Sequence, residues 1–304
     1  MSKKIFLDTD IGDDIDDALA LIMLLKMNVD IVGISTVFKN TDLRARLANK
    51  IVKMMGKNIP VYKGYGKPFA YDVDLHSSFA QYEKDLDNDC YKARNENEED
   101  AVDAIIDACY KYQKDLIVLA IGPYTNLAKA IQKDKKAFEL IDKIVVMGCC
   151  FYEQFVEYNA AMDPEATDVV MRAELPIHFV SADVTWKVQL NDEQTNFVLN
   201  YHDDGIDGYC AELVRLWKKN CWFNPVLHDP LAAYYCIDNS ICECEYIWSE
   251  VELNGTITRG MTPNRDHFLK YLEKPLDGKH RIYVTKSVDA KRFNNLFVKT
   301  MFHE

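Results

Sequence analysis

The sequence predicts an α/β protein with a single domain, a mostly parallel, Rossmann-like sheet flanked by helices, and a more helical C-terminal third. Short β-branched or apolar runs alternate with helical patterns of ten or more residues, which is typical of βαβ units. After Asn191 the pattern becomes mainly helical. No internal repeat or Pro/Gly/Ser-rich linker interrupts the chain, so we expect residues 1–304 to form one domain.

Up to residue 190, apolar strands and amphipathic helices are expected to alternate along the chain. In order, these are a strand over 4–8, a helix over 16–27, a strand over 30–38, a helix over 42–56, a helix over 98–112, a strand over 115–122, a helix over 125–134, and strands over 142–148 and 176–183. The polar segment 85–100 is expected to be an exposed loop.

The C-terminal part is predicted to contain helices and one hairpin. Helices are expected over 191–200, 209–220 and 229–237, and a last helix from Asp289 has an apolar face formed by Phe293, Leu296, Phe297 and Met301. A pair of strands is expected within 249–260, with Asn254–Gly255 as its turn. Trp217 and Trp222 are interpreted as packing residues.

Composition excludes several classes of function. With 48% hydrophobic and 28% charged residues the chain is globular. A net charge of −12 argues against nucleic acid or an anionic membrane as a partner. The longest apolar run, 18–25, is too short to span a bilayer. The nine cysteines include no C-x-x-C pair, so we expect reduced thiols and a cytoplasmic protein.

Six aspartates lie between Asp8 and Asp17, where the first strand ends and the first helix begins. In a parallel sheet, ligands bind at the carboxyl ends of the strands. One aspartate can cap a helix, but crowded carboxylates repel one another by about 1–4 kcal/mol per close pair, which a single helix N-terminus does not offset. A divalent cation does offset it, and oxygen ligands favour Ca²⁺ or Mg²⁺. The segment therefore predicts a hard-metal site.

An apolar strand followed by D-x-D also opens phosphatases of the haloacid-dehalogenase type, in which the first aspartate is the nucleophile. That alternative stays open from the strand alone, although it gives Asp16 and Asp17 no role.

The segment resembles the signature "D-T-D-x-G-x-D-D-A-x-A" of the inosine–uridine preferring nucleoside hydrolases, which are ribonucleoside N-glycosidases. The loop is two residues longer here, so the alignment selects Asp16 and Asp17, with Asp14 as the alternative. Four later segments are also similar to family motifs: "STVFKN" ending at Asn40, "VLAIGPYTNLA" around Ile121, "VEYNAAMDPEA" with Glu157 and Asn159, and "HDPLAA" with His228 and Asp229.

Two segments depart from the family pattern. Phe151 stands near the place where well-known members carry an asparagine for the ribose 5′-hydroxyl. The family's His-Gly-rich loop near the base is replaced by "DLHSSFAQYEKD", in which His76 is the candidate remnant. These differences concern the base and the 5′-position rather than the metal site.

The resemblance implies calcium-dependent hydrolysis of the N-glycosidic bond of purine or pyrimidine ribonucleosides, giving free base and ribose. It implies a Ca²⁺ ion held by Asp10, Asp17, the Ile121 carbonyl and Asp229. Asp10 would also take the proton of the attacking water, and His228 would protonate the leaving base. Asp8 would orient the loop. Ribose contacts are implied for Asp16, Asn40, Glu157, Tyr158 and Asn159.

The partner implied is a small-molecule ribonucleoside, in nucleoside salvage or catabolism, and family members suggest a homodimer or homotetramer. The alternative from another class is a non-catalytic, metal-dependent ribose- or nucleoside-binding paralogue. Retention of Asp10, Asp17 and Asp229 favours the enzyme.

Overall fold

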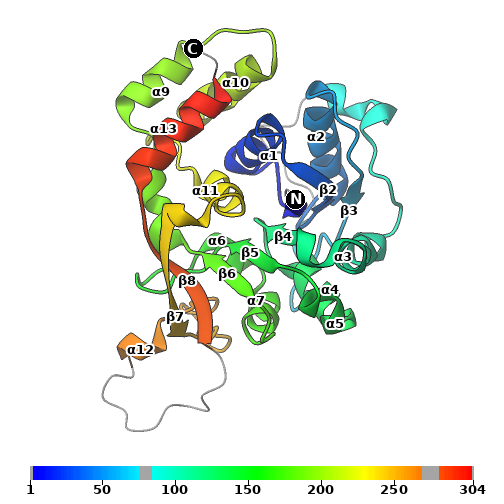
Figure 1. Cartoon of the computed structure of the whole chain (residues 1–304), viewed down its shortest axis with the longest axis vertical. Helices are drawn as coiled ribbons and strands as arrows, with labels where there is room; N and C mark the ends of the chain where they lie inside the picture. Colours follow the sequence, from blue (N-terminus) through cyan, green and yellow to red (C-terminus); the bar gives the residue numbers. More distant parts are fainter. Residues whose placement is uncertain (1–2, 75–83, 269–280, 303–304) are drawn as a thin grey trace.

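An eight-stranded sheet runs through the computed structural model, which describes residues 3–74, 84–268 and 281–302 (Figure 1). The strand order is β3-β2-β1-β4-β5-β6-β8-β7, and every neighbouring pair is parallel except β7 with β8. The strands are β1 (Lys4–Thr9), β2 (Asp30–Thr36), β3 (Val61–Lys63), β4 (Leu116–Ala120), β5 (Lys143–Met147), β6 (Ile177–Val180), β7 (Cys242–Trp248) and β8 (Arg281–Val288). This confirms the predicted α/β class and the mostly parallel sheet.

Helices cover both faces of the sheet, because successive strand side chains point to opposite faces. Leu7 of β1 belongs to one apolar cluster and its neighbour Phe6 to the other. The first cluster includes side chains of α1 (Asp16–Lys26), α2 (Thr41–Met54), α9 (Asp192–Leu199), α10 (Ile206–Asn220), α11 (His228–Tyr235) and α13 (Ala290–Met301). The second includes those of α3 (Glu99–Tyr112), α4 (Thr125–Lys133), α5 (Lys135–Glu139), α6 (Tyr158–Met162) and α7 (Pro164–Met171). Two short helices, α8 (Ala182–Thr185) and α12 (Arg265–Phe268), complete the set described.

The predicted hairpin within 249–260 is wrong. These residues form turns, and Ser249 alone makes a bridge, to Asn264. The backbone N–H groups of Asn254 and Gly255 both donate to the Glu252 carboxylate, at 2.7 and 3.0 Å, so a side chain closes the tight turn. The Glu252 backbone also bonds the Met261 carbonyl at 2.8 Å and the Gly260 N–H at 2.7 Å, which closes a loop without forming strands. The antiparallel pair is formed instead by β7 and β8, which the sequence analysis did not predict.

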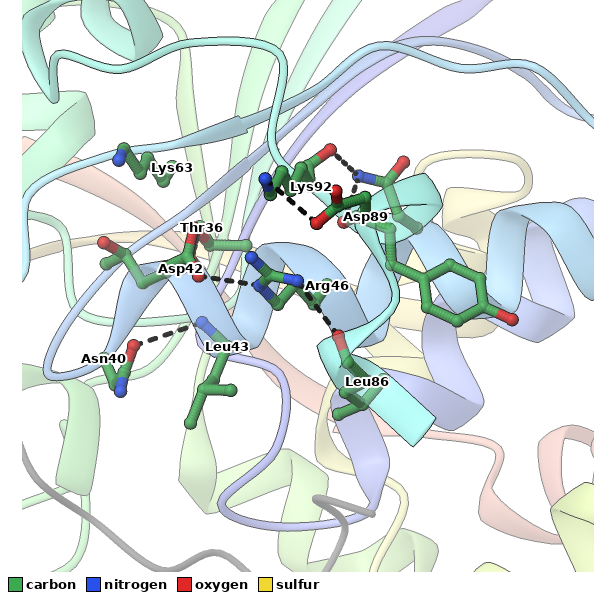
Figure 2. A network of polar contacts seen from close by, with 12 residues as sticks. Thr36, Asn40, Asp42, Leu43, Arg46, Lys63, Leu86, Asp89 and Lys92 are labelled. Carbon is green, nitrogen blue, oxygen red and sulfur yellow. Dashed lines mark hydrogen bonds and ion pairs between the residues drawn. The ribbon is translucent and has the colours of Figure 1, made fainter. Parts of the chain in front are cut away.

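Segment 85–100 is mostly exposed, as predicted, but it is anchored to α2, as Figure 2 shows, and also to β3. It contains two 3-10 turns, Lys84–Asp87 and Asp89–Tyr91. Arg46 of α2 donates to the Leu86 carbonyl at 3.1 Å, and the Asn49 side chain donates to two carbonyls of the second turn region. Asn95 bonds both the N–H and the carbonyl of Lys63 in β3. The segment therefore packs as a defined part of the fold.

Within the described residues, no helix is long and apolar enough to cross a membrane. All nine cysteines are free thiols, and six of them are buried.

One buried ion pair connects three helices of the same layer. The ammonium of Lys26, in α1, contacts the carboxylate of Asp207, in α10, and also donates to the Met301 carbonyl of α13 at 2.6 Å. Both charged side chains are more than nine-tenths buried. Removing one partner of such a pair leaves an uncompensated charge in the interior.

We expect Lys26→Met to lower the free energy of unfolding by about 3–5 kcal/mol, because Asp207 is left buried without its cation. Urea denaturation measures this change. The control is Lys67→Met, which breaks the exposed Lys67–Asp72 pair and should change stability by about 0–1 kcal/mol. If the two substitutions lowered the free energy of unfolding equally, the buried ion pair would contribute no more to stability than the exposed one.

Candidate active site

A cavity of about 680 Å³ lies at the carboxyl ends of the parallel strands. Its lining comes from segments far apart in the sequence, namely Asp10, Asp13, Asp14, Asp16, Asp17, Lys39, Ile121, Met147, Phe155, Val156, Glu157, Tyr158, Asn159, Ala182, Trp186, Trp217, Phe223, Val226, His228 and Asp229. Nine of the ten residues predicted to contact metal or substrate are in this lining, and Asn40 is the exception. The aspartates after β1 lie at the carboxyl end of that strand, as the strand-end rule predicts.

Asp8 lies beneath the cavity rather than in its lining. Its Oδ1 accepts hydrogen bonds from the Ser35 hydroxyl at 2.6 Å and from the Asn126 amide at 2.8 Å. These contacts tie the end of β1 to β2 and α4. Full burial raises the pKa of Asp8 to about 7. This geometry agrees with the predicted role of orienting the acidic loop.

Three carboxylates from two helix starts converge at the cavity. One oxygen each of Asp16, Asp17 and Asp229 lies within 4.8 Å of the other two, and all three residues are buried. The backbone N–H of Asp229 donates to Asp16 at 3.3 Å, and the Thr9 hydroxyl donates to Asp17. Asp16, which the resemblance assigned to ribose, is thus a member of the close acidic group.

Asp10 lines the same cavity from the end of β1 but lies outside that group of three. Its position depends on Gly122, directly after Ile121. A Cβ atom at 122 would lie 2.7 Å from Asp10 Oδ1 and 2.8 Å from the Asp10 nitrogen. Any side chain at 122 would therefore displace Asp10, so the glycine is required by close approach rather than by a turn.

Burial and mutual repulsion raise the pKa values of five carboxyl groups at this cavity. The pKa values of Asp10, Asp16 and Asp229 lie well above the ordinary range, chiefly through burial and next through neighbouring aspartates. Burial raises the pKa of Asp17 to about 6 and that of Asp14 to about 7. A bound cation would favour the ionised form of these groups and so lower their pKa values.

A hard divalent cation fits these residues. The ligand set is all oxygen and the three close carboxylates are buried. Their pKa values stay raised although Arg44, the Thr9 hydroxyl and the Asp229 N–H favour the charged form of Asp16 or Asp17. Asp10 and the Ile121 carbonyl lie on the same cavity and can complete the set. Zinc is disfavoured, since neither a cysteine nor a histidine belongs to the close group.

Glu157 and Asn159 are held rigidly against the cavity. Glu157 caps α6, and its carboxylate accepts from the backbone N–H groups of Cys149, Asn159 and Ala160 at 2.9–3.1 Å. The Cys149 N–H is aimed at it because Gly148 and Cys149 both have positive φ. The Asn159 amide donates to the carbonyls of Ile121 at 2.9 Å and Met147 at 3.2 Å.

Tyr158 reaches across the cavity from α6 to the acidic loop. Its hydroxyl donates to Asp13 at 3.2 Å, and its ring lies edge-on to Phe38. Asp13 in turn accepts from the buried guanidinium of Arg44 at 3.0 Å. The same guanidinium donates to the Ile11 carbonyl at 3.0 Å, so Arg44 fixes the lengthened loop.

Asn40 is the one predicted site residue outside the lining. Its Oδ1 accepts from the Leu43 N–H at 3.1 Å and so caps α2 (Figure 2). Lys39, its neighbour, lines the cavity instead, because Phe38 and Lys39 both have positive φ and redirect the chain after β2. A ribose contact of Asn40 stays a prediction. His76 lies outside the described residues.

His228 is the first residue of α11, next to Asp229. Its Nδ1 lies 2.6 Å from the Thr185 hydroxyl, and its ring is edge-on to Trp186 with the centroids 5.0 Å apart. Burial lowers the pKa of His228 to about 4, so the ring is neutral near pH 7 and carries one N–H donor.

An aromatic wall, defined by Trp186, Trp217 and Phe223, forms the side of the cavity near His228. Trp186 and Phe223 were not predicted as site residues from the sequence, and Trp217 was interpreted as a packing residue only. Trp222 is 91% exposed, so its interpretation as packing is wrong. The position of Trp186 soon after a parallel strand could have identified it as a site residue, whereas no local sequence feature predicts that Phe223 lines the cavity.

Phe151, at the position of a departure from the family pattern, is buried and packs edge-on against Phe179, 5.8 Å away. It is not part of the lining. The side chain that replaces the usual asparagine therefore fills the core.

Comparison with known proteins agrees with this geometry. The sequence model of the family described as "Inosine-uridine preferring nucleoside hydrolase" matches residues 5–295. The inosine-uridine preferring nucleoside hydrolase of Crithidia fasciculata is 27% identical over 288 residues, covering 86% of this chain and 87% of that protein. Uridine nucleosidase 1 of Arabidopsis thaliana is 28% identical, covering 76% and 72%. The solved purine-preferring ribonucleoside hydrolase of Gardnerella vaginalis is 26% identical, covers 98% of both chains and has a TM-score of 0.78.

Proposed function

The chain belongs to the inosine-uridine preferring nucleoside hydrolase family, and from this premise we propose that it hydrolyses the N-glycosidic bond of ribonucleosides in a calcium-dependent reaction. The family match favours this over a phosphatase of the haloacid-dehalogenase type. The observation that carries the proposal is the buried carboxylate group of Asp16, Asp17 and Asp229, with Asp10 on the same cavity wall.

The metal would be held by Asp10, Asp17, Asp229 and the Ile121 carbonyl, and Asp16 is close enough to be a further ligand. Calcium suits this set because it accepts six to eight oxygen ligands in flexible geometry. Bound there, the cation would neutralise the carboxylates, lower the pKa of a water and orient the ribose diol.

The residues of the chain perform the remaining steps. Asp10, at the end of β1, accepts the proton of the water that attacks C1′. Asp16, Glu157 and Asn159 bind the ribose hydroxyls from two sides, and Tyr158 covers the sugar. His228 donates to the base nitrogen that receives the electron pair of the broken bond, while the aromatic wall contacts the base.

The cell would use this reaction in nucleoside salvage or catabolism, in the cytoplasm and as a homodimer or homotetramer. These three points follow from the family and from the reduced thiols, and each stays a prediction.

Product analysis tests the proposal against the binding paralogue. Incubation with inosine and with uridine should release free ribose and the free base in equal amounts, measured by reducing-sugar assay and chromatography. Asp10→Asn is the control and should abolish release because the base for the water is lost. A protein that is stabilised thermally by nucleosides but releases no ribose would be the non-catalytic binder.

Removing the metal should lower both activity and the melting temperature at pH 7.5. At a hundredfold excess over its dissociation constant a ligand contributes about 2.7 kcal/mol, which corresponds to roughly 4 °C for a chain of this size. Differential scanning fluorimetry with and without EGTA measures the shift, and re-addition of Ca²⁺ or Mg²⁺ identifies the ion.

The chelator effect should be smaller at pH 5. In the metal-free fold the pKa values of Asp14 and Asp17 are raised to about 7 and 6, so the folded state binds protons more tightly than the unfolded chain. That contribution is present at low pH and is lost as the pH rises from about 4 to 7. Protons thus replace the cation in acid. An unchanged melting temperature together with no metal by elemental analysis would disprove the site.

A further inference from the structure

Two successive residues at the end of α8, the short helix that follows β6, contact the ring of His228. The hydroxyl oxygen of Thr185 lies 2.6 Å from His228 Nδ1, and the Thr185 side chain is fully buried. Trp186 packs edge-on against the same ring, with an interplanar angle of 89°. Because α8 follows a central strand of the sheet, these contacts come from a rigid part of the scaffold.

We propose that Thr185 is a positioning residue that holds His228 with its Nε2–H directed into the cavity, toward the base nitrogen of the ribonucleoside. The inference rests on the proposed function, and it names a residue for which neither the sequence motifs nor the composition gave a role.

The hydrogen bond of the Thr185 hydroxyl determines the tautomer of His228. In a neutral imidazole one nitrogen carries the hydrogen and the other accepts. Over residues 3–74, 84–268 and 281–302, the Thr185 hydroxyl has a single hydrogen-bond contact, which is His228 Nδ1. If Nδ1 carried the hydrogen, the buried hydroxyl would accept and its own hydrogen would be left unpaired, which is unfavourable. The hydroxyl therefore donates to Nδ1, and the ring hydrogen is on Nε2.

Nε2 is then the ring nitrogen that faces substrate. His228 lines the cavity, and within the described chain no protein atom forms a hydrogen bond with Nε2. A donor there stabilises the electron pair that remains on the base nitrogen as the C1′–N bond breaks. Since the Thr185 hydroxyl can rotate from donor to acceptor, the ring keeps the same orientation in its protonated form.

Kinetics on two substrates tests the proposal. Thr185→Val removes only the hydroxyl and should lower kcat/KM for uridine or inosine roughly tenfold to a hundredfold. It should change kcat/KM for p-nitrophenyl riboside far less, since that leaving group departs as a stable anion. Thr185→Ser keeps the hydroxyl and should restore nucleoside hydrolysis. Thr167→Val is the matched control, because Thr167 of α7 is equally buried and its hydroxyl donates to the carbonyl of Asp163, the N-cap of that helix, at 2.9 Å. This substitution should change kcat/KM for neither substrate.

The double variant shows whether Thr185 acts through the ring. In a His228→Ala background, Thr185→Val should have no further effect on the nucleoside. Equal losses on both substrates in the single variant, or the full loss repeated in the His228→Ala background, would overturn the proposal.

A spectroscopic measurement decides the same point without activity. The long-range ¹H–¹⁵N spectrum of histidine side chains distinguishes the two tautomers, and the His228 signals are assigned by their absence in His228→Gln. The wild-type protein should show the Nε2–H pattern, and Thr185→Val should show a mixture. An Nδ1–H pattern in the wild type would refute the inference. Absence of ribose release by the wild type would refute the proposed function instead. The spectrum would still show whether Thr185 sets the tautomer of His228.

Discussion

Asp229→Ala should abolish hydrolysis of nucleosides and of p-nitrophenyl riboside alike, whereas His228→Ala should cripple only the nucleoside reaction. The two residues are adjacent in sequence, and both line the cavity, but we assign them different tasks. Asp229 belongs to the carboxylate group that would hold the cation, and both substrates need that cation. Its loss should lower kcat/KM by several orders of magnitude on each.

His228 acts on the leaving group. A nucleoside base departs poorly without a donor, and a positioned acid or base contributes about 10²–10⁴-fold. A nitrophenolate is stable as the anion and needs no donor, so its release should be largely spared in His228→Ala. Steady-state kinetics measures kcat/KM of each variant for the nucleoside and for p-nitrophenyl riboside.

His178→Gln is the matched control for this experiment. His178 is also a partly buried histidine whose pKa is lowered by burial to about 4, but its Nδ1 contacts the Tyr235 hydroxyl and it lines a separate cavity of about 120 Å³. Its substitution should leave kcat/KM for the nucleoside and for p-nitrophenyl riboside unchanged. Should His228→Ala slow the two substrates equally, His228 positions ribose or holds the loop, and His76 becomes the next candidate donor.

Removal of either ribose hydroxyl should be nearly as damaging. The proposed site binds the 2′- and 3′-hydroxyls with the cation and with buried carboxylates, including Asp16 and Glu157. A substrate without one hydroxyl leaves those polar groups desolvated and unpaired. A site built to bond a hydroxyl rejects the analogue that lacks it by about 10⁴–10⁵-fold. We therefore expect a loss of this size in kcat/KM for 2′-deoxyuridine relative to uridine.

Binding gives an independent measure of the same contact. Ribose should raise the melting temperature of the calcium-loaded protein, and 2-deoxyribose should not. The control is the EGTA-treated protein, in which neither sugar should have an effect. Comparable turnover of uridine and 2′-deoxyuridine would remove the diol from the proposed site, although the carboxylate group could still bind metal.

The sequence by itself determined the class of the sheet and the end of the sheet at which the acidic segment lies. The apolar strand ending at Asp8, the acidic segment and the helix from Asp16 are local patterns, and each is found where it was expected. The strand-end rule placed the aspartates at the carboxyl edge of the sheet, and the family resemblance supplied the other residues; nine of the ten residues so predicted line one cavity.

Only the tertiary structure decided which side chains meet. The β7–β8 pair joins β6 across about a hundred residues, a separation that no local pattern in the sequence spans. Asn40 follows the expected strand, but the positive φ at Phe38 and Lys39 directs its side chain to a helix cap.

The direction of a side chain depends on contacts that are distant in sequence, and local patterns do not contain them. Asp16 joins Asp229 through a hydrogen bond that spans 213 residues, and Thr185 meets His228 across 43. Periodicity and strand ends report which face or edge a residue occupies. Which carboxylates share a cation, and which hydroxyl holds the histidine, follow only once the helices are packed on the sheet.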